Sequence, residues 1–272
     1  MPNPGTLICP RRVAIEGMAE SETAHLSLLE PNGVHSDADL LQLYHYPDVS
    51  ERAWVRANVI AGLDGAAAAD GTSGALGSAG DKHIFDLLRA LADVILVGAG
   101  TVRSEGYSGC QIEPARRRQR GERGQTEVPP IAIVTRAGLL DPELPVFTST
   151  AVPPLVLTCT AAADDTRRQL GRLAEVIDCS DTDPADLDHA TLLAQLQTRG
   201  LRRILTEGGP TLLGSLIDAD LLDDLCLTLA PLLVGGSGGR ISSGTREVLT
   251  RMRRAHVLTD ADGYLYTRYV KT

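Results

Sequence analysis

The chain of 272 residues has few aromatic residues and an excess of acidic ones. Phenylalanine, tryptophan and tyrosine together make up 3% of the sequence, and the formal net charge is −9 at pH 7. Nucleic-acid recognition relies on basic surfaces and, for single strands, on aromatic side chains that stack against bases. The composition therefore disfavours nucleic-acid binding, and any anionic nucleotide has to be bound by local backbone amides and a few arginines.

Signals for metal sites and membrane spans are also lacking. No two of the five cysteines stand at a spacing typical of metal ligands, and their number is odd. The chain has no apolar run long enough to cross a bilayer and no signal-peptide pattern. We therefore expect reduced thiols, no metal, no membrane partner and a cytoplasmic location. The cysteines are Cys9, Cys110, Cys159, Cys179 and Cys226.

Several motifs of nucleotide-binding and hydrolytic enzymes are incomplete. The sequence Gly98-Ala99-Gly100 lacks the third glycine of the dinucleotide-binding fingerprint, because position 103 is arginine. Neither a G-x-x-x-x-G-K-[ST] loop nor a zinc deaminase signature is found. Residues 235–239 match the letters G-x-S-x-G, but no convincing helix follows, which disfavours a serine nucleophile. We interpret this segment instead as a glycine-rich strand end beside a ligand.

Short strands and helices alternate from residue 53 onwards, which predicts an α/β fold with a mixed, mainly parallel sheet flanked by helices. The last strands follow one another without long helices, and the turn at 260–263 predicts an antiparallel C-terminal hairpin. The predicted strands are 53–63, 93–97, 131–135, 155–159, 176–179, 203–206, 224–234, 256–259 and 264–270, and the predicted helices are 81–90, 164–173, 187–199 and 211–218.

Two regions lack this alternation. Residues 1–52 form a predicted N-terminal extension that is partly helical, and we expect one domain from 53 to 272. Ser36 is a good N-cap for a short helix that Pro47 would end. Residues 108–129 are polar and rich in arginine, and we expect them to form an exposed loop.

Three turns at the carboxyl ends of predicted strands are candidates for a nucleotide site: 98–101, 208–211 and 135–136. Ligands of open α/β sheets bind at this edge. Glycines allow backbone amides to approach a phosphate, and a helix N-terminus favours negative charge. Pro210 is suited to the first turn of such a helix. Each turn alone is also explained as a plain strand-to-helix connection, but three in one sheet favour a ligand.

Five segments, in sequence order, resemble the C-terminal reductase domain of the bifunctional riboflavin-biosynthesis deaminase-reductase. This domain is a member of the dihydrofolate-reductase-like superfamily. The resemblance covers roughly residues 53–270 and leaves out the deaminase half. It implies a dihydrofolate-reductase-like fold and NADPH as hydride donor. It also implies reduction of the ribosyl group of 5-amino-6-(5-phosphoribosylamino)uracil, and a homodimer. The segments are RANVIAGLDG (56–65), LRA with ADVILVGAGTV (88–102), IVTR (133–136), EGGPTL (207–212) and LAPLLVGG (229–236).

The resemblance also assigns residues to the site. Ser73, Arg89 and Glu207 are expected to face the substrate, although a solvated helix face would also explain Arg89, and a favourable helix dipole would also explain Glu207. Asp64 is expected to act in the chemistry or to anchor the substrate, and the alternative is that it only caps an Asp-Gly turn. The expected cofactor contacts are Ile60, Gly98, Gly100, Thr101, Glu105, Thr135, Arg136, Gly208, Gly209, Pro210, Thr211 and Leu212, with Thr135 and Arg136 near the 2′-phosphate.

One departure from the family leaves the substrate open. An arginine that helps to bind the substrate's phosphate in bifunctional members is replaced here by Ile112. An arginine of the following segment is a possible substitute, or that segment is simply a solvated basic run. Reduction of dihydrofolate or a related pterin is the alternative, and a nucleotide-binding protein without turnover is the third hypothesis. A phosphate-binding arginine favours the pyrimidine, and a flat apolar slot favours the pterin. The arginines concerned are Arg116, Arg117, Arg118, Arg120 and Arg123.

Overall fold

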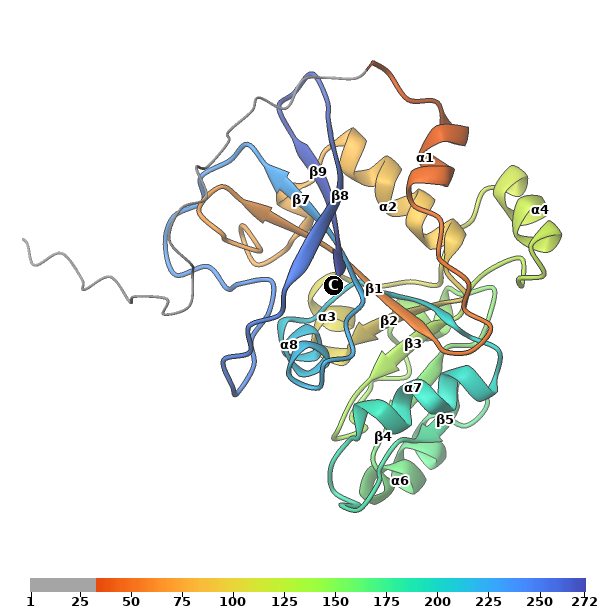
Figure 1. Ribbon diagram of the computed structural model, residues 1–272. Helices are drawn as coiled ribbons and strands as arrows, with labels where there is room; N and C mark the ends of the chain where they lie inside the picture. The colour runs from red at the N-terminus through yellow and green to blue at the C-terminus, as the bar shows by residue number, and fades with distance from the viewer. Residues whose placement is uncertain (1–32) are drawn as a thin grey trace, which may run out of the picture. The chain divides into compact units, whose positions relative to one another are not determined.

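A mixed sheet forms the centre of the computed structural model, which describes residues 33–272 (Figure 1). Within these residues the sheet has nine strands in the order β5-β4-β3-β2-β6-β1-β7-β9-β8. The predicted extension before residue 33 lies outside the described residues. The strands are β1 (Trp54–Gly62), β2 (Val94–Gly98), β3 (Ile131–Val134), β4 (Leu155–Thr158), β5 (Glu175–Asp178), β6 (Arg203–Thr206), β7 (Asp224–Ala230), β8 (Met252–Thr259) and β9 (Leu265–Lys271).

The pairing of the strands confirms the predicted fold class. All pairs from β5 through β7 are parallel, whereas β9 pairs antiparallel with both β7 and β8. The predicted C-terminal hairpin is therefore present, with β9 inserted between β7 and β8. Strand β7 ends at Ala230, earlier than the predicted residue 234. Because the parallel strands share one direction, the predicted ligand-binding turns meet at one edge of the sheet.

Helices cover both faces of the parallel part of the sheet. In β2, Val94 and Leu96 pack in one hydrophobic cluster, and Ile95 and Val97 pack in the other. The first cluster includes side chains of α7 and α8, and the second includes side chains of α2 and α3. No helix of the described residues is long and apolar enough to cross a membrane. The helices are α1 (Asp37–Leu43), α2 (Ala79–Leu91), α3 (Ala99–Ser104), α4 (Pro114–Glu122), α5 (Pro145–Thr148), α6 (Thr160–Leu170), α7 (His189–Thr198) and α8 (Pro210–Asp218), with a 3-10 helix at Gly74–Leu76.

Helix α1 confirms the helix predicted after Ser36. The Ser36 hydroxyl accepts a hydrogen bond from the Asp39 amide at 3.3 Å, and the Asp39 carboxylate accepts one from the Ser36 amide at 2.9 Å. This reciprocal arrangement is a capping box, and it satisfies two amides at the start of the helix. The segment that follows α1 places Tyr44 and Tyr46 in the hydrophobic core.

The expected exposed loop at 108–129 is wrong in its middle, because residues 114–122 form α4. Pro114 occupies the first turn, where its missing N–H costs nothing. Arg120 is fully buried, contrary to the expectation of a solvated basic segment. Its guanidinium donates hydrogen bonds to carbonyl groups at the end of α2. These partners lie about 30 residues earlier, so the local composition does not predict them.

A buried carboxylate, Asp224, joins the parallel strands to the antiparallel hairpin. Arg56 Nε donates to Asp224 Oδ2 at 2.8 Å, and Arg268 Nη2 donates to the same oxygen at 2.8 Å. Arg56 and Asp224 are fully buried. Other nitrogens of the same two guanidinium groups donate to backbone carbonyls at and just after the end of α1, from Leu43 to His45. The cluster therefore connects β1, β7 and β9 to the segment that precedes the predicted domain boundary.

Replacing Asp224 by asparagine should destabilise the fold strongly, because two buried guanidinium groups then lose their carboxylate. We expect the free energy of unfolding, measured by urea denaturation, to fall by about 3–5 kcal/mol. Asp164→Asn is the matched control, since Asp164 forms an exposed ion pair with Arg167 and its loss should cost about 0.5 kcal/mol. Similar losses in the two variants would contradict the role assigned to the buried cluster.

Candidate active site

A cavity of about 980 Å³ lies at the carboxyl edge of the sheet. Its floor includes residues 58–60 of β1 and the turn that follows β6, and α2 and the chain after α3 supply its walls. A segment after β7, including Gly239 and Arg240, also lines it. This volume is at the upper end of the range typical of small-molecule and cofactor sites. The location is the one predicted for ligand binding in a parallel sheet.

Two of the predicted glycine turns contact each other beside this cavity. The Gly98 amide donates to the Gly208 carbonyl at 3.0 Å. Gly209 has a φ of +88°, and an added Cβ there would lie 3.0 Å from Thr101 Oγ1. Both the backbone conformation and the space therefore require glycine. Helix α8 begins directly after this turn at Pro210, and within the described residues no side chain caps it. Its first amides are therefore without a side-chain partner in that part of the chain.

An ion pair between Arg89 and Glu207 forms one wall of the cavity. Arg89 Nε and Nη2 donate to the two carboxylate oxygens of Glu207 at 2.6 and 2.7 Å. The Tyr107 hydroxyl donates to Glu207 Oε2 at 2.7 Å. The Arg89 guanidinium lies 4.1 Å from the centre of the Phe85 ring. The solvated helix face considered for Arg89 is thus not what the structure shows.

Burial and this ion pair change the pKa values of the surrounding groups. Burial opposes the charged form of Arg89, but the Glu207 carboxylate outweighs it and raises the pKa of the guanidinium. Burial, together with the nearby Glu207 charge, raises the pKa of Tyr107 well above its ordinary value. Burial also raises the pKa of the Cys110 thiol to about 11. The arginine and the tyrosine therefore act as hydrogen-bond donors to Glu207 at neutral pH.

The arginine-rich segment binds the end of α2 instead of lining the cavity. Arg120 Nη1 donates to the carbonyls of Arg89, Ala90 and Ala92 at 3.3, 3.1 and 2.6 Å. Arg123 Nη2 donates to the Ala90 carbonyl at 2.9 Å. These carbonyls lack partners within the helix, so the guanidinium groups serve as a C-terminal cap. Since Arg89 belongs to the same helical end, α4 helps to fix the backbone from which Arg89 reaches Glu207.

Most of the residues predicted for the site line the main cavity. Gly98 lies behind the Gly208 turn, Gly100 and Thr211 are exposed near it, and Leu212 is buried in the core under α8. Lining the cavity are Ile60, Ser73, Arg89, Thr101, Glu105, Glu207, Gly208, Gly209 and Pro210. These locations place the residues but do not test their roles.

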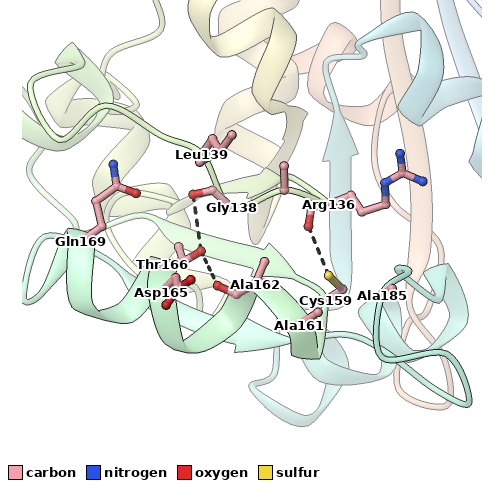
Figure 2. A pocket seen from close by; sticks show the side chains of 11 residues that line it. Arg136, Gly138, Leu139, Cys159, Ala161, Ala162, Asp165, Thr166, Gln169 and Ala185 are labelled. Atoms are coloured by element: carbon pink, nitrogen blue, oxygen red, sulfur yellow. Dashed lines mark hydrogen bonds between the residues drawn. The ribbon is translucent and has the colours of Figure 1, made fainter.

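Thr135 and Arg136 lie beyond the main cavity, at a smaller one. This second cavity, of about 360 Å³, lies between the turn after β3 and helix α6, and Arg136 is among its lining residues (Figure 2). The Arg136 side chain extends to the end of the cavity opposite Gln169. The buried Thr135 hydroxyl accepts a hydrogen bond from the Gly138 amide at 3.2 Å and shapes this turn.

Asp64 has the contacts of a turn-capping side chain. Its carboxylate accepts hydrogen bonds from the amides of Gly235, Val234 and Ala66 at 2.6, 3.0 and 3.3 Å. These bonds, led by that of Gly235, lower the pKa of the carboxyl below its ordinary value. Asp64 is exposed and is not among the residues that line the cavity. Its assignment to the chemistry stays a prediction.

Three charged residues of the cavity wall were not predicted: Asp81 and Lys82 in the first turn of α2, and Arg240 after β7. Burial raises the pKa of the Asp81 carboxyl, although a hydrogen bond to the Thr228 side chain opposes this. The glycines of 235–239 were the available signal for Arg240. The expected strand end at this segment is absent, because residues 235–239 form no strand. Gly239 does line the cavity.

Comparison with known proteins shows what the chain resembles. Residues 53–266 match the family model described as the RibD C-terminal domain. A 2,5-diamino-6-ribosylamino-4(3H)-pyrimidinone 5′-phosphate reductase of Archaeoglobus fulgidus is 26% identical over 217 residues, covering 79% of this chain and 97% of that protein. A protein of the same name from Methanothermobacter thermautotrophicus is 28% identical over 190 residues, covering 70% and 82%. A solved structure, a pyrimidine reductase-like protein of Corynebacterium diphtheriae, has the same fold with a TM-score of 0.74 at 24% identity, covering 86% and 98%.

Replacing Arg120 by methionine should leave the carbonyls at the end of α2 without donors while nearly preserving the length of the side chain. We expect the free energy of unfolding to fall by about 2–4 kcal/mol in urea denaturation. Arg118→Met is the matched control, because Arg118 is exposed on the same helix, and it should change stability by about 0.5 kcal/mol at most. If both variants retain the stability of the parent chain, Arg120 is not the cap of α2.

Proposed function

The chain belongs to the RibD C-terminal domain family, and from this premise we propose that it is an NADPH-dependent pyrimidine reductase. Its proposed substrate is a ribosylamino-pyrimidine 5′-phosphate, whose ribosyl group becomes a ribityl group. The observation that supports this best is the joining, in one cavity, of the Gly208-Gly209 turn with the wall formed by Arg89 and Glu207. The first is suited to a dinucleotide, and the second is suited to a polar ring or sugar.

The cavity edge fits the cofactor. Gly209 leaves space beside Thr101, and the uncapped start of α8 offers amides and a positive dipole to a pyrophosphate. When bound, NADPH supplies a hydride from its nicotinamide ring. Arg136, at the carboxyl edge two strands away from β6, is the residue we propose for the 2′-phosphate, because a guanidinium suits a phosphate dianion. This contact would favour NADPH over NADH.

The substrate is proposed to lie on the α2 side of the cavity, against Ser73, Arg89 and Glu207. Reduction of the opened ribosylamine adds a hydride to the sugar carbon of the C=N bond and a proton to the nitrogen. Two carboxyl groups that line the cavity already accept hydrogen bonds from the protein. Glu207 accepts them from Arg89 and Tyr107, and Glu105 accepts one from the Ser73 amide at 2.8 Å. Asp81 lines the cavity, and burial raises the pKa of its carboxyl, which favours the protonated form of a donor. We therefore propose it for this step beside the earlier candidate Asp64.

The resemblance further implies a homodimer, and the cysteine pattern predicts a cytoplasmic location. Both properties stay predictions. Exposed leucines on adjoining segments at the ends of β1, β7 and β9 are candidates for a contact with a second copy. Light scattering of the purified chain tests the dimer. The leucines are Leu63, Leu232, Leu233 and Leu265.

The proposed reaction predicts that NADPH absorbance falls when the purified chain is given a ribosylamino-pyrimidine 5′-phosphate. Both the uracil form and the 2,5-diamino form should be offered, with dihydrofolate in parallel and NADH as the alternative donor. We expect turnover with a pyrimidine and a preference for NADPH that Arg136→Ala weakens. Turnover with dihydrofolate alone would replace this assignment by pterin reduction. Binding of NADPH without oxidation would support a nucleotide-binding protein.

Asp81→Asn and Asp64→Asn should separate the two candidate proton donors. A donor must be protonated, so activity that depends on Asp81 should fall as the pH rises through its raised pKa, and the variant should lose that limb of the profile. We expect Asp81→Asn to lower kcat about a hundredfold. Asp64→Asn should mainly loosen the turn bound to Gly235, with kcat changed less than fivefold. The opposite order of effects would return the chemistry to Asp64.

A further inference from the structure

A strap of residues 238–244 crosses the edge of the main cavity between two fixed points. At one end the Ala67 amide donates to the Gly239 carbonyl at 2.9 Å, and at the other the Ser243 amide donates to the Pro210 carbonyl at 2.9 Å. An added Cβ on Gly214 would collide with the Ser243 carbonyl, so the strap lies tightly against α8. The strap is therefore held both to the chain after β1 and to the start of α8, next to the glycine turn.

Arg240 is the cationic residue of this strap, and it lines the cavity together with Gly239 and Ile241. Its side chain is exposed and has no hydrogen bond or ion pair with any residue that the structure describes. A guanidinium held at a cavity by a strap fixed at both ends, with its donors free, is arranged to bind an anion.

The other cationic side chains of the cavity wall are already engaged. Arg89 is committed to both carboxylate oxygens of Glu207, so its charge is neutralised. Lys82 Nζ lies 2.8 Å from the Asp86 carboxylate on the exposed face of α2. The α4 arginines do not line the cavity, and Arg120 and Arg123 bind the end of α2. In a chain with a net charge of −9, an anionic ligand therefore depends on a local cation. Among the described residues that line the cavity, Arg240 is the cation without a partner in residues 33–272.

We propose that Arg240 binds a phosphate group of a ligand in the main cavity. This inference rests on the proposed function, which supplies two sources of the same chemistry. One is the pyrophosphate of the dinucleotide at the start of α8, and the other is the 5′-phosphate of the pyrimidine substrate. If the source is the substrate, Arg240 takes the role that the sequence left open when Ile112 replaced the family's arginine. Ile112 itself is buried in the hydrophobic core.

The test uses the full chain with Arg240→Ala, Arg240→Lys and, as the matched control, Arg253→Ala, which removes an exposed arginine from β8. The dissociation constants of NADPH and of the pyrimidine 5′-phosphate are measured by calorimetry, without turnover. The KM values of the phosphorylated pyrimidine and of its dephosphorylated form are measured alongside. We expect Arg240→Ala to weaken one phosphorylated ligand by about tenfold to a hundredfold. Arg240→Lys should restore part of the loss, and the control should change nothing.

The pattern of losses identifies the source of the phosphate. Weaker NADPH binding with an unchanged KM for the pyrimidine assigns Arg240 to the cofactor. A raised KM for the phosphorylated pyrimidine, with the dephosphorylated form unaffected, assigns it to the substrate. Unchanged affinities for both ligands overturn the proposal, even if the parent chain turns over as expected. If the parent chain binds NADPH but reduces no pyrimidine, the proposed function is refuted. The effect of Arg240→Ala on NADPH binding then decides by itself whether Arg240 binds a phosphate.

Discussion

The ion pair between Arg89 and Glu207 holds the candidate site together, because it connects elements that are far apart in the sequence. Arg89 is near the end of α2, and Glu207 follows β6 at the centre of the sheet. Their side chains are 13% and 2% exposed, so either charge alone would be costly. Tyr107 adds a hydrogen bond from the chain after α3. This nearly buried ion pair thereby determines the position of the cavity wall relative to the glycine turn. Helix α4 supports the pair by capping the end of α2.

The two edges of the parallel sheet use their polar groups differently. At the amino edge, carboxylates accept hydrogen bonds from backbone amides. Asp93 accepts hydrogen bonds from the amides of Arg202 and Arg203, and Asp223 accepts one from the amide of Val55. These bonds satisfy strand ends inside the protein. At the carboxyl edge, the turn at Gly209 leads into a helix without a side-chain cap. The amino edge is thus closed by the chain's own side chains, and the carboxyl edge keeps donors for a ligand.

Much of the fold and part of the site were predictable from the sequence, because their causes are local. Alternating apolar segments predicted the parallel sheet, and the Asp-Gly turn at 260–263 predicted the hairpin. The burial of Arg120 was not predictable, because its partners are carbonyls about 30 residues earlier and its neighbours are polar. For Asp64 the sequence left both a catalytic and a turn-capping role open, and its contact with Gly235 was not predictable because it depends on the chain after β7. Arg240 was missed for a related reason, since only the anchoring of its strap places it at the cavity.

The contacts of Arg56 and Arg268 bear on where this domain begins. The family match starts at residue 53, yet these guanidinium groups donate to carbonyls between Leu43 and His45. The family match therefore defines the part of the chain that is shared with relatives. The contacts that keep the buried arginines out of water define a longer part that is needed for folding. By the second criterion the segment from Ser36 to His45 belongs to the domain, and in a chain trimmed to the homologous region water would have to enter beside Asp224 to solvate two arginines.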